Sequence, residues 1–229
     1  KKISSVGIYW PDFNEINAET LETKWRIKKR PVIAITFYSA LLQSGQTEVI
    51  DALISALGKY YNCIPICSKS FKDKKNSDVT SYLLKKYNPI SVINLTGFSL
   101  SGMSSFKTIF DDARRPVFQV ILSSMSQHQW QDSSKGLNNR DIIMSISLPE
   151  IDGRIITKTI AFKEEVSFDK LTQAKLLEYA PHEFGINYIC NFVKNWSKLS
   201  FTPNENKNIF ICLANYPNKD SRIANGVGL

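Results

Sequence analysis

The chain has 229 residues, 43% of them hydrophobic, which is enough for a globular protein with a sizeable core. Its longest apolar run, Pro31–Leu42, is too short for a membrane span, and its first residues lack the apolar stretch of a secretory signal, so we expect a cytoplasmic protein. The formal net charge is +8, but the basic clusters Lys24–Arg30 and Lys69–Lys75 lack the aromatic interleaving of an RNA-binding surface, so we expect no nucleic-acid partner.

The first expected element is a strand, Val6–Trp10, whose partners would lie upstream of the chain. From Arg30 onward, strand and helix signals alternate, and short apolar runs predict strands that are buried on both faces. These strands are Val32–Phe37, Cys63–Cys67, Ser91–Thr96 and Val117–Leu122. Cys63 and Cys67 fall on one face of their strand and are expected as reduced thiols in the core.

Three helices are expected between these strands, each with apolar residues at helical spacing. Ser44–Thr47 and Ser77 supply capping residues for the first two. The expected inward faces are Val49, Ile50, Leu53 and Leu57, then Val79, Tyr82, Leu83 and Tyr87, then Phe106, Ile109, Phe110 and Ala113. Strands separated in this way pair in parallel through right-handed crossovers. The sequence therefore predicts an α/β fold, a flavodoxin-like doubly wound parallel sheet, over residues 31–165, preceded by a strand and linker over residues 1–30.

The pattern changes after the fourth strand. Arg154–Phe162 has strand composition, and an amphipathic helix is expected from His182 to Leu199, within a helical connector over residues 166–204. Ile209–Ala214 predicts a buried strand, so residues 205–229 are expected to be the truncated start of a further α/β unit. Asn225–Gly228 resembles part of a phosphate loop but lacks the lysine and the glycine spacing of a P-loop.

Ligands of an open parallel sheet bind beyond the carboxyl ends of its strands. The corresponding segments here are Tyr38–Gly45, Thr96–Ser101 and Ser123–Ser126, which are rich in small and hydroxyl-bearing residues. Backbone and hydroxyl donors in these segments would meet a ligand. Turn formation and helix capping explain the same serines equally well.

The segment Pro149–Arg154 has the strongest chemical character. It places Glu150 and Asp152 one residue apart, ahead of a glycine and Arg154. A carboxylate can accept a proton and can guide a hard cation, so this segment is a candidate for proton transfer or metal delivery. A turn in which Asp152 bonds backbone and Arg154 pairs with an acid would account for the same residues.

Histidine chemistry is not expected. His128 and His182 are interpreted as surface or cap residues, and nothing resembles a Ser-His-Asp or Cys-His nucleophile set.

Several stretches taken in order resemble one family. They include Leu41–Thr47, Asn94–Phe98, Pro116–Ser123, Leu148–Ile156, Phe162–Glu165 and Ala214–Leu229. Together they resemble the large-subunit family of the cobaltochelatases and magnesium chelatases. Arg154 with Ile155 and Ile156 after the glycine favours the aerobic cobaltochelatase branch, the CobN type, over the magnesium branch.

The resemblance implies an ATP-dependent metal chelatase, of which this chain is a fragment without activity of its own. The large subunit would bind Co²⁺ and hydrogenobyrinic acid a,c-diamide, for cobalamin biosynthesis. ATP, with Mg²⁺, would be hydrolysed by two partner subunits of the AAA+ and integrin-like kind, not by this chain. A magnesium chelatase acting on protoporphyrin, or a non-catalytic scaffold for partner subunits, stays open as an alternative.

The same resemblance suggests roles for individual residues. Glu150 and Asp152 are the candidates for proton acceptance or metal delivery, and Glu150 is the candidate metal ligand. The candidates to bind the substrate are Arg154, Arg140, Gln119, Ser123, Ser44 and Thr47. Both arginines would hold substrate carboxylates in bidentate fashion. One departure stands out, because the family carries a basic residue directly after Phe37-Tyr38, where this chain has Ser39.

Overall fold

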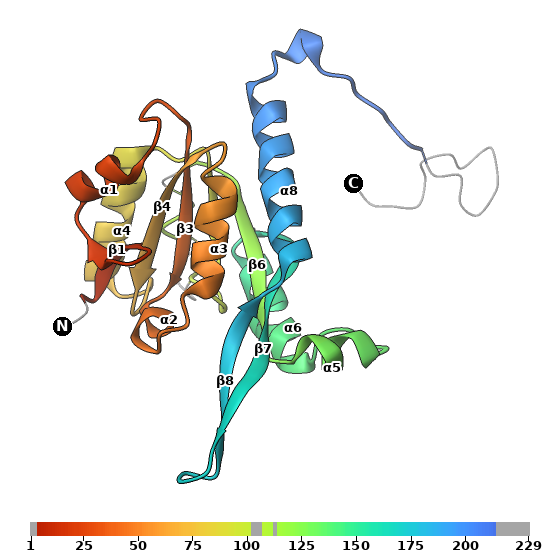
Figure 1. Cartoon of the computed structure of the whole chain (residues 1–229). Helices are drawn as coiled ribbons and strands as arrows, with labels where there is room; N and C mark the ends of the chain where they lie inside the picture. Colours follow the sequence, from red (N-terminus) through yellow and green to blue (C-terminus); the bar gives the residue numbers. More distant parts are fainter. Residues whose placement is uncertain (1–3, 102–106, 112–113, 214–229) are drawn as a thin grey trace. The chain divides into compact units, whose positions relative to one another are not determined.

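The computed structural model describes residues 4–101, 107–111 and 114–213 of the chain. Its strands form one eight-stranded sheet in the order β2-β1-β4-β3-β5-β6-β7-β8 (Figure 1). The strands are β1 (Val6–Trp10), β2 (Asn14–Ile16), β3 (Val32–Tyr38), β4 (Asn62–Ser68), β5 (Ser91–Asn94), β6 (Val117–Ser123), β7 (Ile155–Asp169) and β8 (Ala174–Pro181). The chain divides into two compact units, one of residues 1–194, which holds the whole sheet, and one of residues 195–229.

The centre of the sheet is parallel. Strands β4, β3, β5, β6 and β7 pair in parallel, and numbered along the chain from β3 they lie in the order 2-1-3-4-5 of a flavodoxin-like fold. The predicted fold class is therefore confirmed. The two edges are antiparallel, because β1 pairs with β4 and β2, and β8 pairs with β7. The strand Val6–Trp10 thus finds its partners within the chain, and the expectation of upstream partners was wrong.

Helices cover both faces of the sheet (Figure 1). They are α1 (Ala18–Lys24), α2 (Ser39–Gln43), α3 (Glu48–Leu57), α4 (Lys74–Tyr87), α5 (Gln127–Asp132), α6 (Asn139–Ile142), α7 (Leu148–Ile151) and α8 (Glu183–Phe201), with a π-helix at Ile143–Ser147. Helices α1 and α4 pack on one face, and α3 lies on the other. Within the described residues, no helix has both the length and the apolar character needed to cross a membrane.

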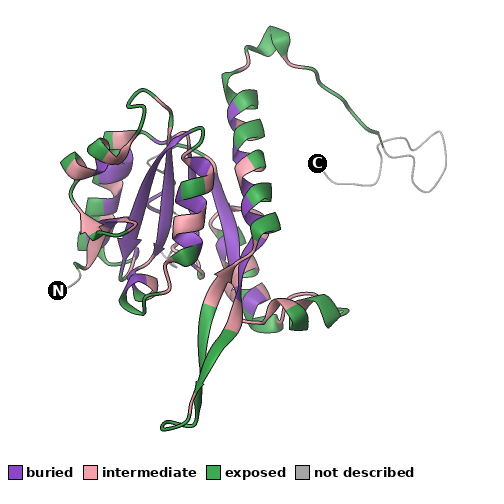
Figure 2. Ribbon diagram, viewed as in Figure 1, coloured by how far each residue is buried: buried purple, intermediate pink, exposed green. Residues whose placement is uncertain are grey.

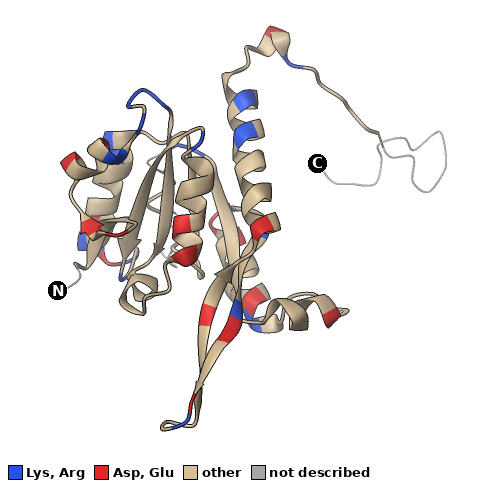
Figure 3. Ribbon diagram, in the orientation of Figure 1, with Lys and Arg blue, Asp and Glu red and all other residues tan. Residues whose placement is uncertain are grey.

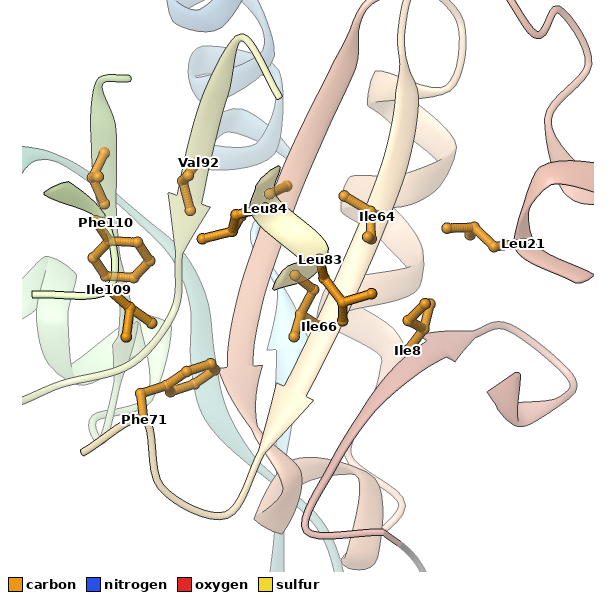
Figure 4. Packing of buried hydrophobic residues seen from close by; sticks show 12 residues of the cluster. Ile8, Leu21, Ile64, Ile66, Phe71, Leu83, Leu84, Val92, Ile109 and Phe110 are labelled. Carbon is orange, nitrogen blue, oxygen red and sulfur yellow. The ribbon is translucent and has the colours of Figure 1, made fainter. Parts of the chain in front are cut away.

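Along each strand, side chains that face α1 and α4 alternate with side chains that face α3. Leu21 of α1 and Leu83 of α4 pack against Ile64 and Ile66 of β4 (Figure 4). On the opposite face, all four predicted inward residues of α3 are buried. The central strands are buried along their length (Figure 2), which explains why their sequences are continuous apolar runs.

Helix α4 begins earlier than predicted, and only two of its four predicted inward residues, Leu83 and Tyr87, pack against the core. Asp73, not Ser77, is its N-cap and accepts a hydrogen bond from the Asn76 amide. Val79 and Tyr82 are exposed, at 37% and 62%, while Thr80 is buried beside Leu83 and Leu84. Thr80 donates its hydroxyl to the carbonyl of Asn76, so a threonine can be buried without an unpaired polar group.

The helix expected after the third parallel strand is absent from the residues described there. Ile109 and Phe110 are buried but lie in a turn, and Phe106 and Ala113 lie outside the described residues. The expected connector over residues 166–204 also contains more than a helix. Strand β7 continues past residue 165 and forms a long hairpin with the unpredicted β8, whose outer part is exposed (Figure 2).

Helix α8 confirms the amphipathic helix predicted from His182, with Ile189 and Val193 fully buried. Gly185 permits its approach to β7, because a Cβ at this position would clash with the carbonyl oxygen of Thr159. Among residues 195–213, a 3₁₀ turn at Asn204–Asn206 follows the end of α8. Residues 208–213 form no strand and Phe210 is 91% exposed, so the described part of Ile209–Ala214 does not match the buried strand predicted there. Asn225–Gly228 lies outside the described residues.

Candidate functional site

A row of polar side chains crosses the centre of the apolar sheet. Thr36 of β3 is in register with Asn94 of β5, and Asn94 is in register with Gln119 of β6. All three residues are fully buried. The Thr36 hydroxyl donates to Asn94 Oδ1 at 2.7 Å, and Asn94 Nδ2 donates to Gln119 Oε1 at 2.7 Å. The row therefore forms a chain of hydrogen bonds that runs across three adjacent strands, β3, β5 and β6.

Backbone carbonyls complete this row. Gln119 Nε2 donates to the carbonyls of Thr96 and Val120, at 3.1 and 2.9 Å. Thr96 donates its hydroxyl back to Asn94 Oδ1 at 3.0 Å. A buried amide that lacked these partners would cost about 1–3 kcal/mol for each unsatisfied group. The network is thus satisfied internally, and it fixes the direction in which Gln119 Oε1 points.

Arg154, which immediately precedes β7, joins the row from the next strand. Its side chain is 1% exposed, and one terminal nitrogen donates to Gln119 Oε1 at 3.0 Å and to the Thr96 carbonyl at 3.2 Å. The other terminal nitrogen pairs with Asp152 Oδ2 at 2.6 Å. Burial lowers the pKa of Arg154, and the charge of Asp152 opposes that shift. The guanidinium stays charged because its compensating carboxylate is buried with it.

Asp152 is engaged on both of its oxygens. Its carboxylate accepts hydrogen bonds from the Ser99 hydroxyl at 2.7 Å and from the backbone amides of Leu100 and Ser101, at 2.6 and 3.0 Å. Burial pushes the pKa of Asp152 upward, but these hydrogen bonds outweigh it and the net pKa is lowered. The carboxylate of Asp152 therefore stays ionised and links Arg154 to the loop after β5.

The loop after β5 is closely packed against the π-helix. The amide of Phe98 donates to the Met144 carbonyl at 2.8 Å, and a Cβ on Gly97 would come within 2.9 Å of the same oxygen. Phe98 itself has a φ of +64°, a region that bulky residues rarely occupy, and its side chain is 48% exposed. Strained backbone and π-helical turns both concentrate at functional sites, which supports a site at this edge.

A second polar cluster closes the carboxyl end of β6. Asp141 of α6 is 4% exposed and accepts hydrogen bonds from the Ser123 and Ser124 hydroxyls, both at 2.8 Å. Asn138 caps α6 through the Asp141 amide and also donates to the Ser124 hydroxyl. Ser123 is thus held by Asp141, which docks α6 on the sheet.

The structure brings only some of the predicted site residues together. Gln119, Asp152 and Arg154 form one network, whereas Glu150 lies exposed in α7, and no hydrogen bond or ion pair reaches its carboxylate from the described part of the chain. Arg140 is exposed on α6.

The two predicted residues after β3 lie in the segment between α2 and α3. The Ser44 hydroxyl donates to the Ala40 carbonyl at 2.9 Å, and Thr47 is the N-cap of α3. Ser39, at the position where the family carries a basic residue, is buried at the start of α2.

Bidentate recognition by Arg154 is incompatible with this arrangement, because both terminal nitrogens already have partners and only its buried Nε lacks one. Two members of the network were missed, namely Thr36 and Asn94, whereas Ser99 lies in the segment Thr96–Ser101 that was expected to face a ligand. The available signal was one polar residue inside each of two apolar strands, but pairing them required the register.

The two histidines lie at the surface and at the start of a helix, as predicted. His128 pairs with Asp132 on the exposed side of α5, and the His182 carbonyl accepts from the Ile186 amide at the start of α8. Across residues 4–101, 107–111 and 114–213, no group of three or more potential ligands is arranged to hold a metal ion.

Comparison with known proteins identifies the family. The family model described as CobN/Magnesium Chelatase matches residues 1–229. The chain is 34% identical to the aerobic cobaltochelatase subunit CobN of Sinorhizobium sp, a match that covers 100% of this chain and 19% of that protein. It is 31% identical to the subunit of the same name from Pseudomonas aeruginosa, over 98% of this chain and 18% of the relative.

A solved structure agrees at the level of the fold. The catalytic subunit of cobaltochelatase from Mycobacterium tuberculosis superimposes with a TM-score of 0.69 at 20% identity, over 99% of this chain and 18% of that chain. The chain thus spans about a fifth of the length of the relatives it matches. With a family model that matches its whole length, the chain belongs to the CobN/magnesium chelatase family.

Proposed function

We propose that the chain is part of the large, macrocycle-binding subunit of an ATP-dependent cobaltochelatase, which inserts Co²⁺ into hydrogenobyrinic acid a,c-diamide in cobalamin biosynthesis. The observation that carries this proposal is the 34% identity to an aerobic cobaltochelatase subunit along the whole chain. The polar edge of the sheet supports it, because it places carboxylates and an arginine where ligands of such folds bind.

Glu150 is the residue to which we assign the chemistry. Its carboxylate is exposed in α7, two residues from the buried Asp152, so a macrocycle bound at this end of the sheet would be able to reach it. A carboxylate in this position would accept a proton from an inner N–H of the ring or guide the hard cation toward it. Asp152 is proposed to act through Arg154, as a positioning residue that holds the loop after β5 against α7.

The remaining predicted residues take supporting roles in this proposal. Arg140 is exposed, so its guanidinium is available to hold a substrate carboxylate in bidentate fashion. Ser44 and Thr47, after β3, would line the cleft. Gln119, Ser123 and Arg154 would support the floor of this macrocycle-binding cleft through their buried hydrogen bonds.

The partners in this proposal are the two subunits that hydrolyse ATP with Mg²⁺, one of the AAA+ kind and one integrin-like, in the cytoplasm. This chain would bind no nucleotide for that reaction and would insert no metal alone.

The test is Co²⁺ insertion by the full-length large subunit together with both partner subunits and ATP. Glu150→Gln removes the charge and the basicity of the carboxylate while keeping its shape, and should lower the insertion rate by about 100-fold, the scale of general acid–base catalysis. The matched control is Glu205→Gln, which changes an exposed glutamate in the 3₁₀ turn and should leave the rate unchanged. An unchanged rate in Glu150→Gln would overturn the assignment and favour the scaffold alternative.

A further inference from the structure

A cavity of about 300 Å³ lies at the amino ends of the parallel strands β3 and β4, whereas Asp152 and Arg154 lie at the carboxyl ends of the parallel strands. Its wall is built from the end of β1, the segment that joins α1 to β3, the end of α3 and the start of β4. The lining residues that matter are Lys24, Arg26, Arg30, Lys59, Trp10 and Trp25. Because β3 and β4 begin here, this cavity is separate from the polar site at their carboxyl ends.

The charges around this cavity are all of one sign. Four of the lining residues are cations and none is an acid. Figure 3 shows the basic residues gathered along the segment between α1 and β3, whereas acidic residues lie at the opposite end of α3. Like charges that converge on one space repel each other, and a bound anion removes that repulsion.

These cations are not neutralised by the protein in the part of the chain that the structure describes. None of the four cations belongs to the ion pairs found there, and Lys24 Nζ lies 3.6 Å from the centre of the Phe13 ring, a contact that leaves its charge unpaired. Arg30 donates one hydrogen bond, to the Gly58 carbonyl at 2.9 Å, which uses only part of its guanidinium. Proximity to the carboxyl ends of α1 and α3 favours a cation, but that effect is worth only about 0.3–1 kcal/mol for each.

The aromatic part of the wall is held in place before any ligand arrives. Trp25 donates its indole N–H to the Cys63 carbonyl at 3.0 Å, and its ring packs edge-on against Tyr87 at 5.5 Å between centroids. Trp10, at the end of β1, completes this side of the cavity. Rigid aromatic walls beside cations suit a ligand with a planar ring and negative groups. A volume near 300 Å³ fits a small ligand and not a tetrapyrrole.

We propose that this cavity binds a small planar anion with at least two negative charges, carried by phosphate or carboxylate groups. Such a site goes beyond the proposed chelatase function, which places the macrocycle at the carboxyl ends of the strands. Arg26 and Lys59 would meet the negative groups, and Trp10 and Trp25 would contact the ring.

The test is a calorimetric titration of the 229-residue chain at low salt with three probes. ADP carries phosphates on a planar base, benzene-1,3,5-tricarboxylate carries carboxylates on a ring, and adenosine carries a base without charge. At least one anion should bind with a Kd below about 1 mM, and adenosine should not bind. The tighter of the two anions identifies phosphate or carboxylate as the group recognised. Failure of both anions to bind below about 10 mM would overturn the proposal.

Two double variants separate this cavity from the general positive field. Arg26→Gln with Lys59→Gln removes two cations from the wall, and Lys135→Gln with Lys170→Gln removes two exposed lysines elsewhere. The first should weaken anion binding at least 10-fold, and the second less than twofold. Equal weakening in both would contradict a specific site. The chelatase assay does not enter this test, so either proposal can fail without the other.

Discussion

Charged side chains at the two ends of the parallel strands differ in whether the chain itself supplies their partners. At the carboxyl edge, Arg154 is 1% exposed and every close partner is supplied by the chain, through Asp152, Gln119 and the Thr96 carbonyl. At the amino edge, four cations surround a cavity and none has a carboxylate partner among the described residues. A charge that is satisfied internally fixes a structure, whereas an unsatisfied one is available to a ligand.

The same contrast separates two carboxylates that are two residues apart. Asp152 accepts hydrogen bonds from Ser99, Leu100 and Ser101 in addition to its pair with Arg154. Glu150 is exposed in α7. We therefore expect substitution of Asp152 to affect stability and substitution of Glu150 to affect chemistry.

The largest expected effect follows from Asp152→Asn. The change leaves the guanidinium of Arg154 buried without a countercharge, so the free energy of unfolding should fall by about 3–5 kcal/mol. Chemical denaturation of the 229-residue chain measures it. Asp132→Asn, at an exposed position on α5, is the control and should change stability by less than about 0.5 kcal/mol. Equal stability of the two variants would contradict the structural role of the buried pair.

The stabilisation by Asp152 should also depend on pH. Because the folded state lowers the pKa of Asp152, its contribution is complete above the unfolded value of about 3.9 and is lost as the pH falls through the lower folded value. The stability difference between the wild type and Asp152→Asn should therefore be constant near pH 6 and shrink below about pH 4. A difference that grew on acidification would have the wrong sign.

A smaller effect is expected for Thr36→Val, at the far end of the polar row. The substitution removes the hydroxyl that donates to Asn94 and keeps the side-chain shape, so about 1 kcal/mol of stability should be lost. Thr172→Val, in the exposed turn between β7 and β8, provides the comparison, because its hydroxyl bonds to Asp169 at the surface and its loss should cost less than about 0.5 kcal/mol. Denaturant unfolding of both variants distinguishes the buried hydrogen bond from a general effect of losing a hydroxyl.

The smallest effect is expected for cations of the cavity at the amino ends of the parallel strands. Removing two mutually repelling cations with Arg26→Gln and Lys59→Gln should raise the free energy of unfolding at low salt by roughly 0.2–0.5 kcal/mol. The gain should vanish at about 0.5 M salt, where the charges are screened. A loss of stability at low salt would mean that these cations serve the fold and not a ligand.

Much of the parallel core could be predicted because its strands are continuous apolar runs. Val32–Phe37 and Val117–Leu122 are buried on both faces, and burial of that kind leaves a direct trace in composition. Strand β8 left no such trace, because most of its residues are exposed in the hairpin. The inward face of helix α4 was predicted only in part, because the burial of Thr80 depends on a local hydrogen bond that periodicity does not reveal.

The site was predicted in part for the same reason. Gln119, Asp152 and Arg154 were identified as candidates, but the sequence does not show that they contact each other across β6 and the start of β7. Asn94 was overlooked because one polar residue in an apolar strand has many explanations, and only the register places it between Thr36 and Gln119.

The most direct test of the proposed function is an absorption titration of the full-length large subunit with hydrogenobyrinic acid a,c-diamide, and in parallel with protoporphyrin. We expect a saturable spectral change with the corrinoid, at one molecule for each subunit, and weaker binding of the porphyrin. Tighter binding of protoporphyrin than of the corrinoid would contradict the cobaltochelatase proposal and would assign the chain to the magnesium branch of the family.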